Sequence, residues 1–546
     1  MKIILPMLVI TTLMACNNSQ KEIDLLITNG VVYTCDSAFS VQEAIAIDKG
    51  KILEVGKTAD LKKKYKAKEE VDAEQHAVFP GLIDAHAHFL NYGMSLQQAN
   101  LVGTKSWKEV LNRVEEFGKT STDEWITGNG WDQNDWDDAS FPDNSMLNTL
   151  YPNRPVILSR IDGHAAIANQ KALDLAGIKP GDVLEGGKIE VKDGKLTGIL
   201  IDNATSLVYD KVPAPNAEKI EKALMDAQRN CFAQGLTTID DCGLSSEMAM
   251  GIDSLQKAGK LKMRMFVMLS DSPQNFDWLF KKGKIKTDRL NIRSFKVFAD
   301  GALGSRGACL IKPYTDKPDW HGFLLSPISH FDSVAKIISE HGFQMCTHAI
   351  GDSGNRVILE TYAKYLKGKN DQRWRIEHAQ VVNPADFHYF ADYNIIPSVQ
   401  PTHATSDMYW AEKRLGPERI KSAYANKTLL QQNGWIPLGT DFPVEDISPF
   451  KTFYAAVFRQ DAKGFPAGGF EMENALTREE AIRGMTIWAA KSNFEESEKG
   501  SLEPGKFADV VILNTDLIKA PEEKILQTQV LKTYVGGEKV YDSAKK

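Results

Sequence analysis

Two histidines, His86 and His88, stand two residues apart at the end of an apolar run. On a β-strand the side-chain period is two, so both rings would point the same way and could bind one cation. The pair alone leaves a metal role and a chance occurrence about equally open. Other ligand-type residues in similar positions favour a metal role, because His348 and His378 each end a separate apolar run and Asp441 ends another.

Neutral imidazoles with one carboxylate suit Zn²⁺ or a similar divalent ion. Taken singly, His348 or His378 would be better explained as a hydrogen-bonded core histidine. A cation held by the whole set would lower the pKa of a bound water to around 7 and polarise a substrate carbonyl. Asp441, beside that water, would take its proton and later pass it to a leaving nitrogen. The alternative role for Asp441 is metal ligation alone.

The middle of the chain alternates apolar strand-like runs with helical stretches, which predicts βα units and a parallel sheet. Helices are expected over residues 217–234, 332–341 and 478–490, and strands over 237–239, 294–298, 344–348, 375–378 and 436–441. Several of these strands end in a ligand-type residue, and (β/α)8 barrels carry their catalytic groups at the C-terminal ends of the strands. We therefore predict the α/β class, with a TIM-like barrel over residues 79–494.

Two further regions complete the predicted organisation. Residues 121–200 are rich in Asp, Asn, Gly and Trp and too irregular for one βα unit, so we expect an insertion there that covers the site. Short strands with Gly-containing turns occur in residues 23–78 and again near the C-terminus. We predict that residues 23–78 and 495–546 form a small β-sandwich domain from both ends of the chain.

The first residues have the layout of a secretory signal peptide. Lys2 precedes the apolar run 3–14, which is too short to span a bilayer. The run ends in Leu13-Met14-Ala15-Cys16, which resembles the lipobox of bacterial lipoproteins. That resemblance implies removal of residues 1–15 and a lipid anchor on Cys16, and so a location on the bacterial cell envelope. The alternatives are a plain signal peptide or a buried N-terminal strand.

Charge and composition narrow the choice of partners. The net charge of −7 is spread along the chain without a long basic block, which argues against nucleic-acid binding and favours a small-molecule substrate. Contact with the membrane is expected only through the lipid on Cys16. The oligomeric state stays open, with a homodimer as one option.

The order His-x-His, Lys, His, His, Asp on successive strands resembles the amidohydrolase superfamily, and residues 80–88 resemble its usual opening motif. Other segments resemble the subgroup typified by N-substituted formamide deformylases, amidohydrolase family 3. These segments are 295–308 (FKVFADGALGSRGA), 347–352 (THAIGD), 376–380 (IEHAQ) and 439–444 (GTDFPV). Residues 502–511 (LEPGKFADVV) resemble the superfamily's return strand to the β-domain. The resemblance runs from about residue 23 to the C-terminus.

This resemblance implies a metal centre with one or two divalent cations, most simply Zn²⁺. The ligand set that it implies is His86, His88, Lys296, His348, His378 and Asp441. An ammonium group has no lone pair for a metal, so Lys296 must be altered or stand aside. In the superfamily such a lysine is often carboxylated by CO₂, and the carbamate bridges two cations. The alternative is an uncarboxylated Lys296 beside a single metal.

Seven further residues are candidate substrate contacts or pocket residues. In the resembling subgroup the histidine corresponding to His164 is placed to touch substrate, although a structural role is as well supported. Trp131 and His403 are expected to line the pocket, together with Asp132, Tyr409 and Trp410, although tryptophans more often pack in a core. Arg306 could bind an anionic substrate group or stabilise a loop.

The predicted reaction is hydrolysis of a C–N bond in an amide, an N-formyl compound or a cyclic amide, with Asp441 and Lys296 as the catalytic residues. One alternative is attack on another carbonyl or imine, such as a lactone or an amidine. Another is a non-catalytic surface lipoprotein that binds metal. A binding module has little use for the complete ligand set, so hydrolysis is favoured.

Overall fold

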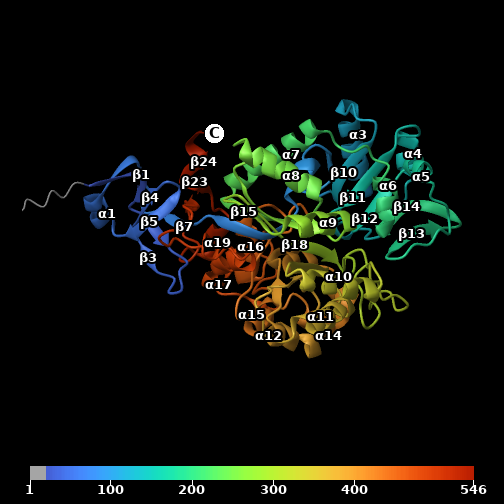
Figure 1. Cartoon of the computed structure of the whole chain (residues 1–546). Helices are drawn as coiled ribbons and strands as arrows, with labels where there is room; N and C mark the ends of the chain where they lie inside the picture. The colour runs from blue at the N-terminus through green and yellow to red at the C-terminus, as the bar shows by residue number, and fades with distance from the viewer. Residues whose placement is uncertain (1–19, 546) are drawn as a thin grey trace, which may run out of the picture.

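The computed structural model describes residues 20–545, and its centre is a nearly closed barrel of parallel strands (Figure 1). The seven strands lie in the order β21-β20-β19-β18-β16-β15-β8, with the short β17 (Ile285–Lys286) antiparallel to β18. In chain order they are β8 (Leu82–Ala87), β15 (Leu236–Leu244), β16 (Arg264–Ser270), β18 (Leu290–Phe298), β19 (Gln344–Ala349), β20 (Arg375–His378) and β21 (Ile396–Ser398). The predicted α/β class and barrel are confirmed.

Residues 436–442 fill the gap between β21 and β8. The Gly439 N–H donates to the Val399 carbonyl at 3.1 Å on one side. On the other side, the Asp441 N–H donates to the His86 carbonyl at 2.8 Å. The segment therefore takes the place of the eighth strand, and it brings Asp441 beside the two histidines of β8 and its C-terminal end.

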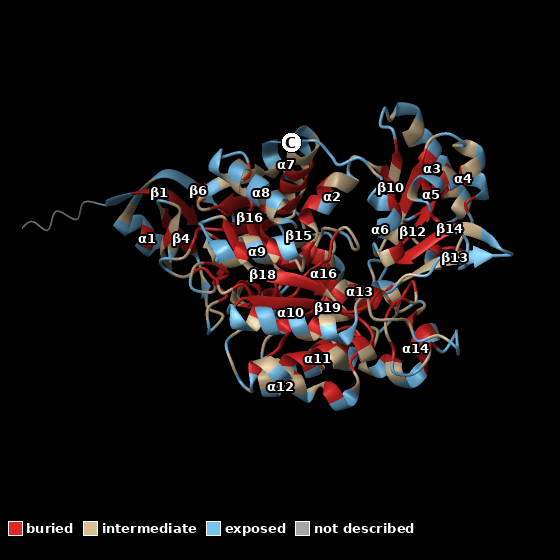
Figure 2. Ribbon diagram, turned by 45° about the vertical axis from the view of Figure 1, so that its right-hand side comes forward, coloured by how far each residue is buried: buried red, intermediate tan, exposed pale blue. Residues whose placement is uncertain are grey.

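The barrel strands are enclosed by helices whose inner faces are buried and whose outer faces are exposed (Figure 2). The main ones are α2 (Phe89–Ser95), α7 (Ala217–Ala233), α8 (Ser246–Lys257), α9 (Pro273–Lys282), α10 (Ile328–Glu340), α11 (Asp352–Leu366), α12 (His388–Tyr393), α15 (Asn426–Asn433) and α16 (Pro449–Phe458). Helix α7 begins where the Asn216 side chain accepts the Lys219 N–H, a standard N-cap. It buries Leu224 and Phe232 against the barrel.

The single helix predicted over residues 478–490 is instead two helices, α17 (Arg478–Gly484) and α18 (Ile487–Ser492). The break falls at Thr486, whose backbone angles of φ −139° and ψ −98° are not helical. The Thr486 hydroxyl bonds back to the Ile482 carbonyl at 2.6 Å. A side-chain bond of this kind competes with the helix ladder and is not visible in the apolar pattern.

A separate six-stranded sheet, in the order β13-β14-β12-β11-β10-β9, lies between β8 and β15 in sequence. Its strands are β9 (Ala99–Asn100), β10 (Ile126–Trp131), β11 (Val156–Arg160), β12 (Ala165–Ala168), β13 (Gly187–Lys192) and β14 (Lys195–Asp202). The insertion therefore begins before the predicted residue 121. Helix α3 (Trp107–Thr120) has the amphipathic pattern of a barrel helix, but its buried Val110 and Val114 belong to the core of this sheet.

Both ends of the chain meet in a third region (Figure 1). The sheet β24-β23-β22-β7-β2-β3 joins β2 (Val31–Tyr33), β3 (Val41–Gln42) and β7 (Ala77–Pro80) to β22 (Val510–Leu513), β23 (Val530–Val535) and β24 (Glu538–Asp542). A second sheet has the order β5-β4-β1-β6, made of β1 (Lys21–Thr28), β4 (Ala44–Asp48), β5 (Lys51–Gly56) and β6 (Tyr65–Asp72). Ile27 and Ile47 of the second sheet share one buried apolar cluster with Val510 and Ile512 of the first.

Within residues 20–545, the helices are all too short or too polar to cross a bilayer. The predicted signal peptide and lipobox, residues 1–16, lie outside the described residues.

Replacement of Gly439 by alanine should lower the free energy of unfolding by about 2–3 kcal/mol, because the new Cβ would overpack the barrel closure. That Cβ would lie 2.6 Å from the His86 backbone nitrogen and 2.9 Å from the His86 carbonyl oxygen, and these backbone atoms of β8 cannot easily shift. Thermal unfolding measures the effect. The matched control is Gly251→Ala in α8, where the Cβ would meet nothing within 4 Å, and it should be neutral or slightly stabilising.

Candidate metal centre

The six predicted ligand residues converge at the C-terminal end of the barrel. Their positions are His86 on β8, His88 directly after it, Lys296 on β18, His348 on β19, His378 at the end of β20, and Asp441 after the closing segment. His86 and Lys296 are completely buried, and His348, His378 and Asp441 are at most 6% exposed. Residues separated by more than three hundred positions in sequence thus lie together at one end of the barrel.

Distances between the donor atoms are those of a compact site. Asp441 Oδ1 lies 3.4 Å from His88 Nε2 and 3.7 Å from His86 Nε2. Lys296 Nζ lies 3.0 Å from His86 Nε2. The His378 ring is 4.7 Å, centre to centre, from the rings of both His86 and His348. His86, His88 and Asp441 therefore offer three donor atoms within 4.8 Å of one another, which is close enough to hold one ion.

Two buried polar atoms support the presence of a cation. Asp441 Oδ1 and His348 Nε2 both have no protein hydrogen-bond partner. Buried polar atoms are nearly always satisfied, and an ion is one of the few explanations for exceptions at a cluster of ligand-type residues. His378, His403 and Asp441 form a second group of donor atoms within 4.8 Å that shares Asp441 with the first. The residues present therefore fit one or two divalent ions.

A second layer of residues orients the ligand rings. His86 Nδ1 lies 2.5 Å from Glu377 Oε2, and His88 Nδ1 lies 3.1 Å from the Cys242 carbonyl. His378 Nδ1 lies 2.6 Å from Gln400 Oε1. Occupying Nδ1 in this way fixes each ring and leaves Nε2 for a metal. These partners were not predicted from the sequence, because a second-layer residue has no spacing of its own that distinguishes it.

Glu377 belongs to a buried ionic chain that runs under the site. Arg375 Nε lies 2.7 Å from Glu377 Oε1, and Arg375 Nη1 lies 3.0 Å from Asp240 Oδ2. All three side chains are fully buried. The sequence contains one sign of this ionic chain: Arg375 and Glu377 are two residues apart on β20, so their side chains point to the same face. His378 breaks that alternation with a φ of 73°, which the sequence does not reveal.

Electrostatics keep the histidine ligands neutral and Asp441 ionised. Burial lowers the pKa of His86, His348 and His378 well below the ordinary value, so each ring keeps a lone pair for a metal. Burial alone would raise the pKa of Asp441. The hydrogen bond from His403 and the adjacent His86 ring outweigh it, and the pKa lies below the usual range.

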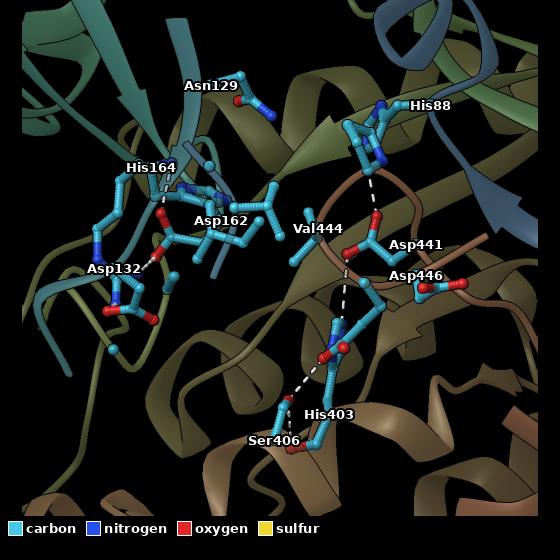
Figure 3. A pocket seen from close by; sticks show the side chains of 18 of the residues that line it. His88, Asn129, Asp132, Asp162, His164, His403, Ser406, Asp441, Val444 and Asp446 are labelled. Carbon is cyan, nitrogen blue, oxygen red and sulfur yellow. Dashed lines mark hydrogen bonds and ion pairs between the residues drawn. The ribbon is translucent and has the colours of Figure 1, made fainter. Parts of the chain in front are cut away.

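A cavity of about 690 Å³ opens beside these ligands. Figure 3 shows its two walls: Asn129, Asp132, Asp162 and His164 from the insertion on one side, and His88, His403, Asp441 and Asp446 from the barrel on the other. The insertion therefore forms one wall of the cavity. A space of this size suits a small organic molecule.

Two predicted contact residues, His164 and His403, line the cavity. His403 Nε2 lies 3.3 Å from Asp441 Oδ2, and His403 Nδ1 lies 3.0 Å from Glu445 Oε1. Burial lowers the pKa of His403, but the two carboxylates outweigh this and raise it to about 10. The His164 ring is 4.9 Å from the His348 ring, centre to centre. Asp132 and Trp410 also line the cavity.

Three other residues that were predicted to contact substrate do not line the cavity, namely Trp131, Arg306 and Tyr409, whose exposed hydroxyl donates to Asp461 Oδ2. Trp131 is fully buried in the core of the insertion, where its indole N–H donates to the Leu158 carbonyl at 2.8 Å. Asp132, directly after the end of β10, lines the cavity instead, and the β10–β11 register shifts between Asn129 and Trp131, so regular alternation does not place these side chains. Arg306 is held in an ion pair with Asp316 at 2.8 Å and does not line the cavity, which favours the loop-stabilising alternative.

Comparisons with known proteins agree with this site. A model of the amidohydrolase family matches residues 69–541. The protein LONG AFTER FAR-RED 3 of Arabidopsis thaliana is 34% identical over 95% of this chain and 91% of that protein. An N-substituted formamide deformylase of Arthrobacter pascens is 26% identical over 94% of this chain and 97% of that enzyme.

Among solved structures, an uncharacterized metal-dependent hydrolase from Pyrococcus horikoshii OT3 superimposes with a TM-score of 0.74 at 27% identity, covering 91% of this chain and 99% of that one. Fold, ligand set and relatives lead to the same conclusion. The chain belongs to the amidohydrolase family and is a metal-dependent hydrolase.

Proposed function

We propose that this hydrolase breaks the carbon–nitrogen bond of an amide, an N-formyl compound or a cyclic amide. The observation that carries the proposal is Asp441, a buried carboxylate with one oxygen lacking a protein partner, at the floor of a cavity between the metal ligands and the insertion. The relative named as an N-substituted formamide deformylase supports the bond type. Water is consumed: a linear amide or N-formyl compound releases an acid and an amine, and a cyclic amide opens to one molecule that carries both groups.

Each residue of the site then has a definite task. His86, His88, His348, His378 and Asp441 would hold the divalent ion or ions, with Zn²⁺ as the ion that best suits this donor set. A bound cation supplies Lewis acidity, which activates a water and polarises the substrate carbonyl. Asp441 Oδ1 accepts the proton of the attacking water and passes it to the leaving nitrogen. His164, on the opposite wall, contacts the substrate.

Lys296 is proposed to carry a carbamate. Its Nζ lies between the ligands, 3.0 Å from His86 Nε2, and is completely buried. An ammonium so close to two potential ions would repel them, whereas a carbamate contributes two anionic oxygens that can bridge them. The carbamate therefore removes a repulsion and completes both donor groups.

Lys296→Met should reduce the cation content from two per chain to one and lower kcat/KM by about 100-fold or more, because the bridging group is lost. Metal analysis by mass spectrometry and rate measurements check this. A carbamate signal in carbon-13 spectra of protein kept in labelled bicarbonate should vanish in the same variant. The control is Lys499→Met, which removes a buried lysine that pairs with Glu495 away from the site. Equal metal content in wild type and Lys296→Met contradicts the proposal.

A substrate panel tests the proposed bond type. The metal-loaded protein is offered N-formyl amines, linear N-acyl amines, cyclic amides, a lactone and an amidine, and release of the amine or acid is measured. Turnover confined to the amides supports the proposal. Turnover of the lactone or amidine alone replaces it with another hydrolysis, and a protein that binds metal without turning over any member contradicts it.

The remaining expectations are proposals of the same kind. They are a lipid anchor on Cys16 with a cell-envelope location, a small-molecule substrate without nucleic acid, a homodimer, and the division into a β-sandwich of residues 23–78 and 495–546 and a barrel of residues 79–494. The sheet that joins both chain ends supports the last of these.

A further inference from the structure

His164 and Asp202 form a hydrogen-bonded pair at the boundary between the insertion and the barrel. His164 Nδ1 lies 2.6 Å from Asp202 Oδ1. The Asp202 side chain is completely buried and that of His164 is 15% exposed. His164 lines the main cavity and also a smaller one of about 280 Å³, and Asp202 lines only the smaller. Asp202 therefore lies behind His164 as seen from the metal ligands.

The sheet register brings this pair together. Strands β12 and β14 are antiparallel, with Ala165 opposite Ile201. The next pair outward is His164 and Asp202, and the Asp202 N–H donates to the His164 carbonyl at 2.8 Å. The two side chains thus meet by backbone pairing, and a ring held in this way has little freedom to turn.

Three features show that the Asp202 carboxylate is tightly confined. Its Oδ2 is buried without a hydrogen-bond partner. A Cβ on Gly301 would lie 2.4 Å from that oxygen, and a Cβ on Gly307 would lie 2.2 Å from it. Both positions, in the loop after β18, must therefore be glycine to leave room for the carboxylate. The backbone of Asp202 has φ 51° and ψ −124°, a conformation that side-chain-bearing residues rarely adopt.

We propose that Asp202 is a positioning residue that acts through His164. A carboxylate at Nδ1 keeps a proton on that nitrogen and fixes the ring plane, which leaves Nε2 as the atom that meets the substrate beside His348. The loop that follows β18 takes part, because Gly301 and Gly307 hold the carboxylate in place. The role of His164 as a substrate contact rests on the proposed function, whereas its placement by Asp202 does not.

The main test is Asp202→Asn, which keeps the shape of the side chain but removes the charge and can present an N–H to Nδ1. In nitrogen-15 spectra of histidine-labelled, metal-loaded protein, wild-type His164 should carry its proton on Nδ1, and the variant should lose that population. The His164→Asn variant assigns the signal. On a substrate that the wild type turns over, kcat/KM should fall about 10- to 100-fold at unchanged metal content.

A double-mutant cycle separates positioning from a structural role. If Asp202 acts through His164, then adding Asp202→Asn to a His164→Asn protein should lower kcat/KM by less than about threefold, because the ring on which Asp202 acts is already gone. Gly307→Ala should reproduce the Asp202→Asn spectrum and much of the rate loss by pushing on Asp202 Oδ2, although both residues of the pair and all the candidate ligands keep their identity. The control is Asp509→Asn, which removes another buried carboxylate, paired with Arg264 far from the cavity. It should lower the thermal midpoint and leave kcat/KM unchanged.

Nitrogen-15 signals of His164 that are the same in Asp202→Asn and in wild type would overturn the proposal. So would a double variant whose loss of kcat/KM equals the product of the two single losses. A wild-type protein without activity on any amide defeats the proposed function instead. In that case the nitrogen-15 spectra of wild type, Asp202→Asn and Gly307→Ala still decide whether Asp202 positions the His164 ring.

Discussion

Asp441→Asn should lower kcat/KM by about 1,000-fold or more while the fold stays intact. The carboxylate has two proposed roles. It accepts a proton, which contributes about 10²–10⁴-fold to the rate, and it is a ligand of the metal. Asparagine cannot accept the proton and is a weaker ligand. The buried Oδ1 without a protein partner is the atom on which both roles depend.

Rates measured at defined metal content separate the two roles of Asp441. If added cation restores full occupancy but not the rate, the loss is one of proton transfer. Asp352→Asn is the control, because Asp352 is also buried but accepts the Ile311 N–H at 2.8 Å and does not line the cavity. A fully loaded Asp441→Asn protein with near wild-type kcat/KM would show that another group accepts the proton.

Removal of the cation by a chelator should abolish activity, with a loss of at least about 1,000-fold, and should also lower stability. The Lewis acidity of the cation is worth several kcal/mol of transition-state stabilisation, and about 4 kcal/mol corresponds to three powers of ten in rate. An ion at 1,000 times its Kd stabilises the native state by about 4 kcal/mol, which is lost on chelation. Thermal unfolding and rate measurements, before and after chelation and again after Zn²⁺ is restored, check both effects.

The variant His88→Asn serves as the matched control for chelation. His88 contributes to the cluster with His86 and Asp441, so its loss should weaken metal binding and reduce the change in unfolding temperature that the chelator causes. The chelated wild-type protein is first shown to be free of metal. If its thermal midpoint and its rate then equal those before chelation, a metal-dependent mechanism is contradicted.

The convergence of the candidate metal ligands could be predicted from the sequence, because a parallel barrel gathers the ends of its strands at one rim. Once His86, His348 and His378 were placed at the ends of separate apolar runs, the barrel itself implied that they meet. The alternation of strands and helices identified the barrel for the same reason, since each βα unit repeats a local pattern. The family resemblance added Lys296, which no spacing rule would have selected.

Other features were decided only by tertiary structure. The boundary of the insertion was misplaced because α3 has the local pattern of a barrel helix, and only packing assigns it to the other sheet. Trp131 ends β10 and packs in the core, whereas Asp132 follows the strand and lines the cavity, so a motif containing both could not say which one lines the cavity.

The fold class and the candidate metal ligands could be inferred from the sequence alone, because both depend on local periodicity and on chemistry that each side chain carries by itself. The second layer, namely Glu377 behind His86, Gln400 behind His378 and Asp202 behind His164, was decided by tertiary structure. These partners are defined by contact between strands far apart in the chain. A carboxylate or amide in an isolated segment gives no sign of the ring that it will hold.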